Sequence, residues 1–342
     1  MNVPKRVLVT GGNGYLGSWI IKQLLLEGHY VNATVRNLND KQRYAHLEGL
    51  EKGSGRLSLF EAELQEHGSF DSAMLGCEYV IHTASPFILS GIKDAQRELT
   101  APAVEGVRNL LESVTRISSV RRVVLTSSAV AIYGDSCESV GREPFTEADW
   151  NTTSTEAHQP YAFSKTLAEK TAWEMASAQS RWDLIALNPG FMLGPAINPA
   201  AAGVSNTIMK NLANGTYKSG IIDVWYGTVD VRDAARAHLR ACFIPEAKDR
   251  YIISSRSASL FEIAQILRAE FGDKYPIPRQ KAPKLIAWLL APSFGLTRRY
   301  VSRNVGYPVY LDNRRSIRDL QMSYAPIETT ILEHFHQVVA TK

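Results

Sequence analysis

Cysteine is scarce in the sequence, and no two cysteines stand at a spacing typical of a metal site. The three thiols, Cys77, Cys137 and Cys242, are far apart in a chain of 342 residues. No Cys-x-x-Cys motif or cluster of cysteine and histidine occurs, so neither a metal site nor a disulfide framework is expected. Reduced thiols are typical of the cytosol, and the sequence therefore favours a cytoplasmic protein.

A long apolar run, a strong charge of one sign and internal repeats are also absent. The longest weakly charged run, residues 285–292, falls far short of the ~20 apolar residues that a membrane span needs. Thirty-eight basic and 34 acidic residues give a net charge of +4, which is too small to indicate nucleic-acid binding. No signal peptide fits before the strand-like segment at Arg6. We therefore expect a globular protein that binds neither membranes nor nucleic acids.

The first half of the chain alternates short aliphatic segments with longer amphipathic ones. Continuous β-branched and aliphatic runs are typical of buried parallel strands, and apolar residues at helical spacing indicate helices between them. This order predicts an α/β fold with a doubly wound parallel sheet of the Rossmann type, which binds ligands at the carboxyl ends of its strands. Strands are expected at residues 6–10, 30–36, 57–60, 79–84 and 123–128, and helices near 16–28 and 93–117.

Three glycines directly follow the first expected strand and open the first expected helix. Gly11, Gly14 and Gly17 have the spacing Gly-x-x-Gly-x-x-Gly, in place of the more common Gly-x-Gly-x-x-Gly. Glycine lets the backbone approach a pyrophosphate, whose charge the helix N-terminus stabilises. A tight turn with only a structural role is the alternative, but the strand, turn, helix and strand within about thirty residues favour a dinucleotide site.

The second expected strand ends in a cation, at the position that distinguishes NAD from NADP. An acidic side chain there would accept hydrogen bonds from the ribose hydroxyls of NAD. This chain has Arg36 instead, followed by Lys41 and Arg43, and cations suit the 2′-phosphate of NADP. The sequence thus predicts NADPH or NADP as cofactor; the alternative is that Arg36 is only a solvated strand end.

A tyrosine and a lysine stand four residues apart in the middle of the chain. Tyr161 and Lys165 would lie one helical turn apart on the same face. An ammonium there can stabilise a phenolate and lower the phenol pKa from ~10 towards neutrality, which suits a general acid for carbonyl reduction. Ser128 ends the fifth expected strand. Taken alone, the pair could be a solvated helix face and the serine a turn residue.

Four ordered motifs carry a family resemblance. They are Thr10–Gly17, Thr126-Ser127-Ser128-Ala129, Tyr161-x-x-x-Lys165 and Asn188-Pro189-Gly190. Together they resemble the extended short-chain dehydrogenase/reductases. Residues 33–36 and 68–71 are similar to the dihydroflavonol reductase and carbonyl reductase branch, and residues 229–235 and 316–320 also match extended-family patterns.

The resemblance implies a role for each motif. Tyr161 would donate the proton, Lys165 would bind the nicotinamide ribose and favour the phenolate, and Ser128 would hydrogen-bond the substrate carbonyl. Glu63 departs from the family, which usually has aspartate at that position. The cofactor contacts implied by the resemblance are Gly11, Gly14, Tyr15, Leu16, Gly17, Arg36, Arg43, Glu63, Leu64, Thr83, Ala84, Lys165 and Pro189.

The second half is expected to form a smaller substrate-binding lobe. Residues 1–190, with roughly 229–253, are assigned to the NADP-binding domain, and 191–228 and 254–342 mostly to the lobe. An apolar, aromatic pocket wall would fit hydrophobic ketones or aldehydes; core packing is the alternative, and residues 285–291 could be a lid or core. The pocket candidates are Phe87, Val130, Tyr133, Met192, Trp225 and Tyr226.

Missing motifs refine the expected reaction. No carboxylates accompany Ser128, as they do in nucleotide-sugar dehydratases, and Arg36 stands where sugar epimerases carry an acid. The Asn-Trp-Tyr-Cys-Tyr segment of cinnamoyl-CoA reductases is absent, and Tyr133 replaces the asparagine of flavonoid enzymes. We expect NADPH-dependent reduction of a small to medium hydrophobic ketone or aldehyde. The alternatives are an NAD-dependent hydroxysteroid-like or sugar-linked alcohol dehydrogenase and a non-catalytic NADP sensor. A homodimer is left open.

Overall fold

A seven-stranded parallel sheet forms the centre of the molecule. A computed structural model describes residues 3–85, 94–201 and 203–340. The strand order is β3-β2-β1-β4-β5-β6-β9, which reverses beside β1 and so confirms the expected doubly wound sheet. The strands are β1 (Arg6–Thr10), β2 (Tyr30–Val35), β3 (Leu57–Glu61), β4 (Tyr79–His82), β5 (Arg122–Thr126), β6 (Asp183–Pro189) and β9 (Asp249–Ile253).

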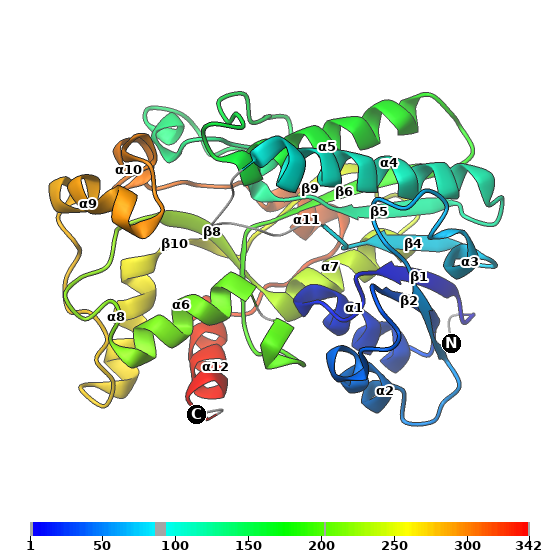
Figure 1. Cartoon of the computed structure of the whole chain (residues 1–342), viewed down its shortest axis with the longest axis horizontal. Coiled ribbons are helices and arrows are strands. Elements are labelled where there is room, and N and C mark those ends of the chain that lie inside the picture. Colours follow the sequence, from blue (N-terminus) through cyan, green and yellow to red (C-terminus); the bar gives the residue numbers. More distant parts are fainter. Residues whose placement is uncertain (1–2, 86–93, 202, 341–342) are drawn as a thin grey trace.

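Helices cover both faces of this sheet (Figure 1). On one face α1 and α7 pack against strand residues such as Val7 and Val9. On the other, α3, α4 and α5 pack against residues such as Leu8 and Val123. Both faces are therefore apolar, which explains the uninterrupted aliphatic strands. The helices are α1 (Tyr15–Leu26), α2 (Ala45–Glu51), α3 (Asp71–Met74), α4 (Ala101–Arg116), α5 (Pro160–Ser177) and α7 (Val231–Phe243), with a π-helical turn at Gln96–Thr100 before α4.

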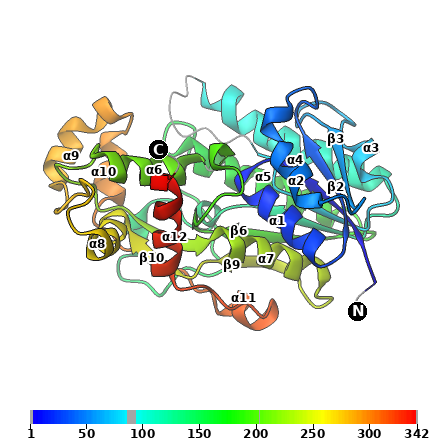
Figure 2. The same cartoon turned by 90° about the horizontal axis from the view of Figure 1, so that it is seen from below.

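A second, three-stranded sheet and most of the remaining helices lie beyond the end of β6 (Figures 1 and 2). The sheet has the order β10-β8-β7, and a separate apolar core joins it to α6, α8 and α12. The elements are β7 (Phe191–Leu193), β8 (Trp225–Asp230), β10 (Arg256–Ser259), α6 (Gly203–Asn214), α8 (Leu260–Phe271), α9 (Lys284–Leu290), α10 (Arg298–Asn304), α11 (Arg314–Asp319) and α12 (Ile327–Ala340). The division into a cofactor domain and a substrate lobe stays a prediction.

Helix α9 presents most of its apolar side chains to solvent. Leu285 is 70% exposed and Leu289 53% exposed, whereas Ala287 and Trp288 on the same helix pack against a small core beneath it. The expectation that this segment is simply core is therefore wrong for the leucines. The alternative, a lid over the substrate site, stays a prediction.

The exposure of α9 predicts that a leucine-to-alanine substitution costs much less stability in this helix than at a buried position. Leu285→Ala is expected to change the free energy of unfolding by less than about 0.5 kcal/mol, because a solvated side chain loses little on truncation. Leu267→Ala, in a fully buried position of α8, is expected to cost about 2–5 kcal/mol. Urea denaturation of both variants measures the difference, and equal losses would show that α9 is packed in solution.

Two features that the sequence did not lead us to expect are a membrane-spanning helix and a metal site. No helix in the described ranges has the length and apolarity to cross a membrane. Within the same ranges, no group of three or more histidine, cysteine, aspartate or glutamate side chains could hold a metal ion. All three cysteines are free thiols.

Candidate active site

The glycine turn after β1 leaves no room for side chains. Gly11 has a left-handed φ of +64°, and a Cβ on it would meet Ala84 at 3.0 Å. A Cβ on Gly17 would lie 2.4 Å from the carbonyl oxygen of Gly11, because α1 packs directly against the turn. These contacts make the turn tight enough for a pyrophosphate to reach the backbone.

The N-terminus of α1 is suited to an anion. Gly14 caps the helix without a side-chain hydrogen bond, and no acidic residue lies in the first turn. The first N–H groups of any helix have no intrahelical partner, and their dipoles favour a negative charge. The residues present therefore fit a dinucleotide pyrophosphate, with Gly14, Tyr15 and Leu16 supplying the backbone.

The side chains beside this turn are already engaged with the protein. The Tyr15 hydroxyl donates to the Gly194 carbonyl oxygen at 2.6 Å, and Leu16 belongs to the main core. The Thr83 hydroxyl donates to the Thr10 carbonyl at 2.6 Å. Tyr15 and Leu16 would thus contact a dinucleotide through their backbone only.

The cations expected at the adenosine end differ in their surroundings. Arg36 is exposed just after β2, and among the described residues no carboxylate pairs with it. Arg43 is also exposed but forms an ion pair with Asp40 at 2.9 Å. Arg36 is thus the better-placed cation for a phosphate.

The two predicted adenine contacts lie after β3. Glu63 is exposed, and its carboxylate accepts a hydrogen bond from the Leu64 amide at 2.9 Å. Leu64 is half-buried against Gly106 of α4, where a Cβ would lie 2.8 Å from it. Glu63 is thus turned onto its own backbone, and its contact with adenine stays a prediction.

Ser128 and Tyr161 are brought together from different elements. Ser128 follows β5, with its hydroxyl accepting a hydrogen bond from the Val130 amide at 3.4 Å. Tyr161 lies in the first turn of α5, which begins at Pro160 after Gln159, a residue with a left-handed φ of 58°. The hydroxyl groups of Ser128 and Tyr161 are hydrogen-bonded to each other. The expected pair therefore meets at the carboxyl end of the sheet.

The protonation of Tyr161 differs from the expectation. Burial raises the pKa of Tyr161 above its ordinary value, and the hydrogen bond with Ser128 offsets only part of this rise. The lowering expected from the Tyr-Lys spacing is therefore absent in this structure, because withdrawing the phenolate from water outweighs the hydrogen bond with Ser128. A phenol that keeps its proton at neutral pH is suited to donate it.

Lys165 is buried below Tyr161 and is tied to the sheet. Its Nζ donates to the Thr126 carbonyl at 3.2 Å and to the Ser85 hydroxyl at 3.3 Å. Burial lowers the pKa of Lys165 to about 8, while the charge of Glu169 raises it. Pro189, at the end of β6, is buried in the same region of the sheet.

Glu169 is a member of this site that the sequence did not reveal. It is fully buried one turn beyond Lys165 on α5, where four-residue spacing from lysine ordinarily indicates a surface ion pair. Its carboxylate accepts hydrogen bonds from Ser127, Asn188 and Arg250. The repeated spacing of residues 161, 165 and 169 was the one signal that could have found it.

One buried tyrosine, Tyr133, and two half-buried ones gather where the substrate pocket is expected. The Tyr226 hydroxyl lies 3.5 Å from that of Tyr300 on α10, and Tyr133 and Tyr226 both act on the pKa of Tyr300, which burial raises well above its ordinary value. Tyr300 was not among the expected residues, because the basic segment around it resembles a solvated helix.

The other pocket candidates do not share one environment. Val130, Met192 and Trp225 are half-buried, and Tyr133 stacks on Phe145 with ring centroids 5.3 Å apart, as the core alternative expects. Phe87 lies outside the described residues. Contact between these side chains and a substrate stays a prediction.

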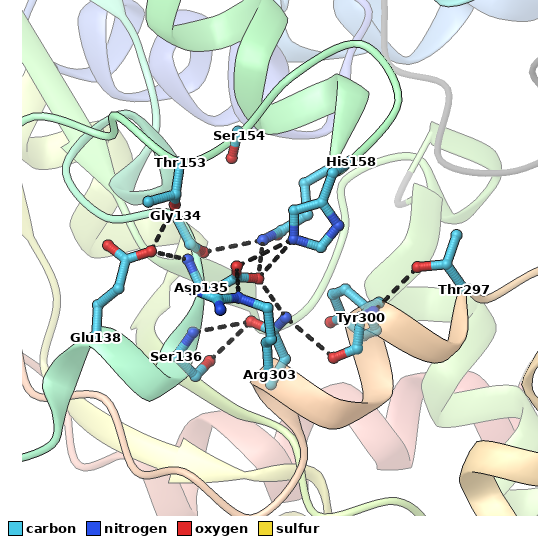
Figure 3. A network of polar contacts seen from close by, with 12 residues as sticks. Gly134, Asp135, Ser136, Glu138, Thr153, Ser154, His158, Thr297, Tyr300 and Arg303 are labelled. Carbon is cyan, nitrogen blue, oxygen red and sulfur yellow. Dashed lines mark hydrogen bonds and ion pairs between the residues drawn. The ribbon is translucent and has the colours of Figure 1, made fainter.

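A buried carboxylate ties α10 to the start of α5 (Figure 3). Asp135, in the loop after β5, is completely buried. It accepts hydrogen bonds from His158 Nε2 at 2.8 Å, from Asn304 Nδ2 at 2.8 Å and from Arg303, and Gln159 Nε2 donates to it at 2.8 Å. The network thus holds the helix that carries Tyr300 against the residues that precede Tyr161.

Removing the Asp135 charge is expected to destabilise the fold and to change its response to acid. Burial alone would raise the pKa of Asp135, but hydrogen bonds from Arg303, Asn304 and His158 lower it below its usual value. Such a carboxyl stabilises the fold above the unfolded pKa of about 3.9, and this stabilisation is lost as pH falls through the lower folded pKa. Because Arg303 is 39% exposed, Asp135→Asn should cost about 3 kcal/mol, at the low end for a buried pair.

Chemical denaturation at neutral pH and near pH 3 checks this expectation. The gap between wild type and Asp135→Asn should be largest at neutral pH and should shrink in acid. Asp273→Asn serves as control, because Asp273 is 72% exposed in its ion pairs with Arg268 and Arg279 and its loss should not be measurable. An equal gap at both pH values would contradict the account.

Three comparisons relate this geometry to known proteins. The model of the NAD dependent epimerase/dehydratase family matches residues 7–253. A cinnamoyl-CoA reductase of Medicago truncatula, CAD2, is 35% identical over 337 residues, which cover 97% of this chain and 95% of that protein. Tetraketide alpha-pyrone reductase 1 of Arabidopsis thaliana is 39% identical over 284 residues, with coverages of 80% and 83%.

Solved structures of known proteins have the same fold as this chain. Gre2 of Candida albicans in complex with NADPH has a TM-score of 0.83 and 27% identity, and the match covers 98% of this chain and 99% of that chain. A further relative found by sequence, a dihydroflavonol 4-reductase of Callistephus chinensis, is 33% identical over 281 residues, covering 82% of this chain and 76% of that protein. The sheet, the glycine turn and these matches lead to one conclusion: the chain belongs to the NAD dependent epimerase/dehydratase family, among the extended short-chain dehydrogenase/reductases.

Proposed function

We propose that the protein reduces a hydrophobic ketone or aldehyde to the alcohol with NADPH. The observation that carries this proposal is the hydrogen bond between Ser128 and Tyr161 above the buried Lys165. Two hydroxyl donors that converge on one point can stabilise the negative charge that develops on a carbonyl oxygen during reduction. NADPH, when bound, supplies the hydride.

Each residue of the site has one task in this reaction. Ser128 orients the carbonyl by donating to its oxygen, and Tyr161 donates the proton that completes the alcohol. The raised pKa of Tyr161 keeps that proton on the phenol until charge appears on the substrate. Lys165, held by Thr126 and Ser85, binds the nicotinamide ribose and supplies a positive charge beside the phenolate that remains.

The cofactor preference rests on the chain's own donor groups. The glycine turn and the uncapped α1 N-terminus would hold the pyrophosphate, and Arg36 would contact the 2′-phosphate. Arg36 is exposed and has no carboxylate partner in the described ranges, so its charge is available for this contact. Two of the similar structures, from Candida albicans and from yeast, are NADPH complexes of Gre2, which supports the same choice.

The substrate class follows from the expected pocket wall. Tyr133, Tyr226 and Tyr300 combine apolar ring faces with a few hydroxyl groups, and such walls suit medium-sized hydrophobic carbonyl compounds. The similar proteins include reductases named for a cinnamoyl-CoA and a tetraketide alpha-pyrone. Aromatic and aliphatic ketones and aldehydes are therefore the first compounds to test.

A screen of such compounds tests the proposal. NADPH absorbance is followed with the purified protein and a panel of aromatic and aliphatic ketones and aldehydes, with NADH as the parallel cofactor. We expect turnover of several hydrophobic members with NADPH and much slower turnover with NADH. Tight NADPH binding without turnover of any compound would instead favour a non-catalytic NADP-binding protein.

A further inference from the structure

Glu169 is fully buried near the proposed site and accepts hydrogen bonds from four side chains. Its Oε1 accepts from Arg250 Nε at 2.6 Å and from Trp173 Nε1 at 3.3 Å. Its Oε2 accepts from Asn188 Nδ2 at 2.8 Å and from the Ser127 hydroxyl. Burying a carboxylate costs free energy of folding unless it is paired and hydrogen-bonded. Here four side chains donate hydrogen bonds to it.

These contacts reach the backbone on both sides of Ser128. Asn188 Nδ2, besides binding Glu169, donates to the Ser128 carbonyl at 3.1 Å. Arg250 Nη2 lies 3.5 Å from the Ala131 carbonyl, and Ser127 is the residue before Ser128. Glu169 therefore connects α5, which carries Tyr161, with the ends of β5 and β6 and with β9.

Glu169 and Lys165 also line the same small cavity. The titratable groups that line this cavity in the described ranges are His82, Lys165 and Glu169. Burial, with the charge of Lys165, lowers the pKa of His82 to about 3. His238, which contacts Thr126 from α7 at 2.8 Å, has its pKa lowered to about 4 by burial.

Both histidines are therefore neutral from mildly acidic to alkaline pH. Tyr161, on the same helix as Lys165, keeps its proton over that range because its pKa is raised. Arg250, from β9, is the remaining charge and is paired with Glu169. The carboxylate of Glu169 is thus the anion that acts on Lys165.

We propose that Glu169 is a positioning residue, which fixes the strand ends that hold Ser128 and lends its negative charge to Lys165. The proposal rests on the function proposed above, in which Ser128 and Lys165 act on substrate and cofactor. Two separable effects follow from it. The hydrogen bonds govern the placement of Ser128, whereas the charge governs how much of Lys165 is an ammonium at a given pH.

Two substitutions separate the charge from the hydrogen bonds. Glu169→Gln keeps the size of the side chain but removes the charge, and its amide nitrogen cannot accept the hydrogen bonds made to one of the two carboxylate oxygens. Glu169→Asp keeps the charge but shortens the side chain by one methylene, so that it no longer spans the distance to Ser127 and Asn188. Asp183→Asn is the matched control, because Asp183 pairs with Arg122 at 2.8 Å at the opposite ends of β5 and β6.

The effect of the Glu169 charge on the ionisation of Lys165 is measured without turnover. Heteronuclear NMR of protein with isotope-labelled lysine, assigned with Lys165→Arg, follows the titration of Lys165. The midpoint should lie near the pKa of about 8 in the wild type, and it should be lower in Glu169→Gln, because the charge that raises the Lys165 pKa is gone. Glu169→Asp should stay near the wild-type value. An unchanged midpoint in Glu169→Gln would overturn the charge assignment.

The positioning effect is measured on the reaction. In both Glu169 variants kcat should fall about 10- to 100-fold, as expected for a misplaced reacting group, while NADPH binding and the melting temperature show the protein folded. The alkaline fall in kcat should move to lower pH in Glu169→Gln only, and Asp183→Asn should keep the wild-type rate and pH profile. Wild-type kcat in both Glu169 variants would overturn the positioning role. If the wild type reduces no carbonyl, the proposed function fails and the lysine titration alone decides.

Discussion

Tyr161→Phe is expected to lower kcat by about 10²- to 10⁴-fold, the usual contribution of a positioned general acid. The variant loses the hydroxyl that is hydrogen-bonded to Ser128, so no side chain can donate the proton to the developing alkoxide. The ring remains and fills the same space. Steady-state kinetics with NADPH and the best compound of the screen measure the loss, and fluorescence titration should show unchanged NADPH binding.

A second half-buried tyrosine provides the control for this substitution. The Tyr324 hydroxyl lies 2.8 Å from that of Ser316, and burial raises the pKa of this phenol also, but its partner Ser316 lies on α11 and not at the end of β5. Tyr324→Phe removes a similar hydroxyl pair and should leave kcat unchanged. If Tyr161→Phe keeps full activity, Tyr161 is not the proton donor.

Arg36→Asp is expected to weaken the use of NADPH by about 10- to 100-fold, the value of a charge-assisted hydrogen bond. The new carboxylate would repel the 2′-phosphate and could accept hydrogen bonds from the ribose hydroxyls of NADH. The KM for NADPH should therefore rise while that for NADH stays the same or falls. The ratio of kcat/KM for the two cofactors, in wild type and variant, measures the change.

Arg43 is the matched control, since it lies nearby but is already paired with Asp40 at 2.9 Å. Arg43→Asp should change the ratio much less than Arg36→Asp. A wild type that prefers NADH would contradict the role of Arg36 and would favour the alternative of an NAD-dependent alcohol dehydrogenase.

The first half of the fold could be predicted because its signals are local. The central parallel strands are buried on both faces, as Val7, Leu8 and Val9 are in β1, and such strands are continuous aliphatic runs. The glycine turn at Gly11 and Gly17 is likewise set by close contacts between neighbouring elements. Sequence periodicity therefore locates these elements, with strand ends shifted by one or two residues.

The second half carried weaker signals. The strand β7 has only three residues, too few for any periodicity, and it is stabilised by pairing with β8 from a distant part of the chain. The helix α6 begins at Gly203, and because glycine is unfavourable within a helix and common in loops, the sequence does not indicate a helix start there. Both elements depend on tertiary packing against α8 and α12.

The same limit applied to the candidate site. Ser128, Tyr161 and Lys165 stand in motifs whose spacing alone suggests chemistry. The roles of Glu169 and Asp135 depend instead on burial and on partners far along the chain, such as Arg250 and Arg303. The direction of the Tyr161 pKa was missed for a related reason, because desolvation cannot be read from spacing.

The central claim is hydride transfer from NADPH to a carbonyl carbon, and isotope transfer tests it most directly. NADPH that carries deuterium at the reactive position of the nicotinamide is incubated with the protein and the best substrate of the screen, and the alcohol is analysed by mass spectrometry. We predict one deuterium on the carbinol carbon, and none with Tyr161→Phe beyond its residual rate. An alcohol without deuterium, or consumption of NADPH without alcohol, would contradict it.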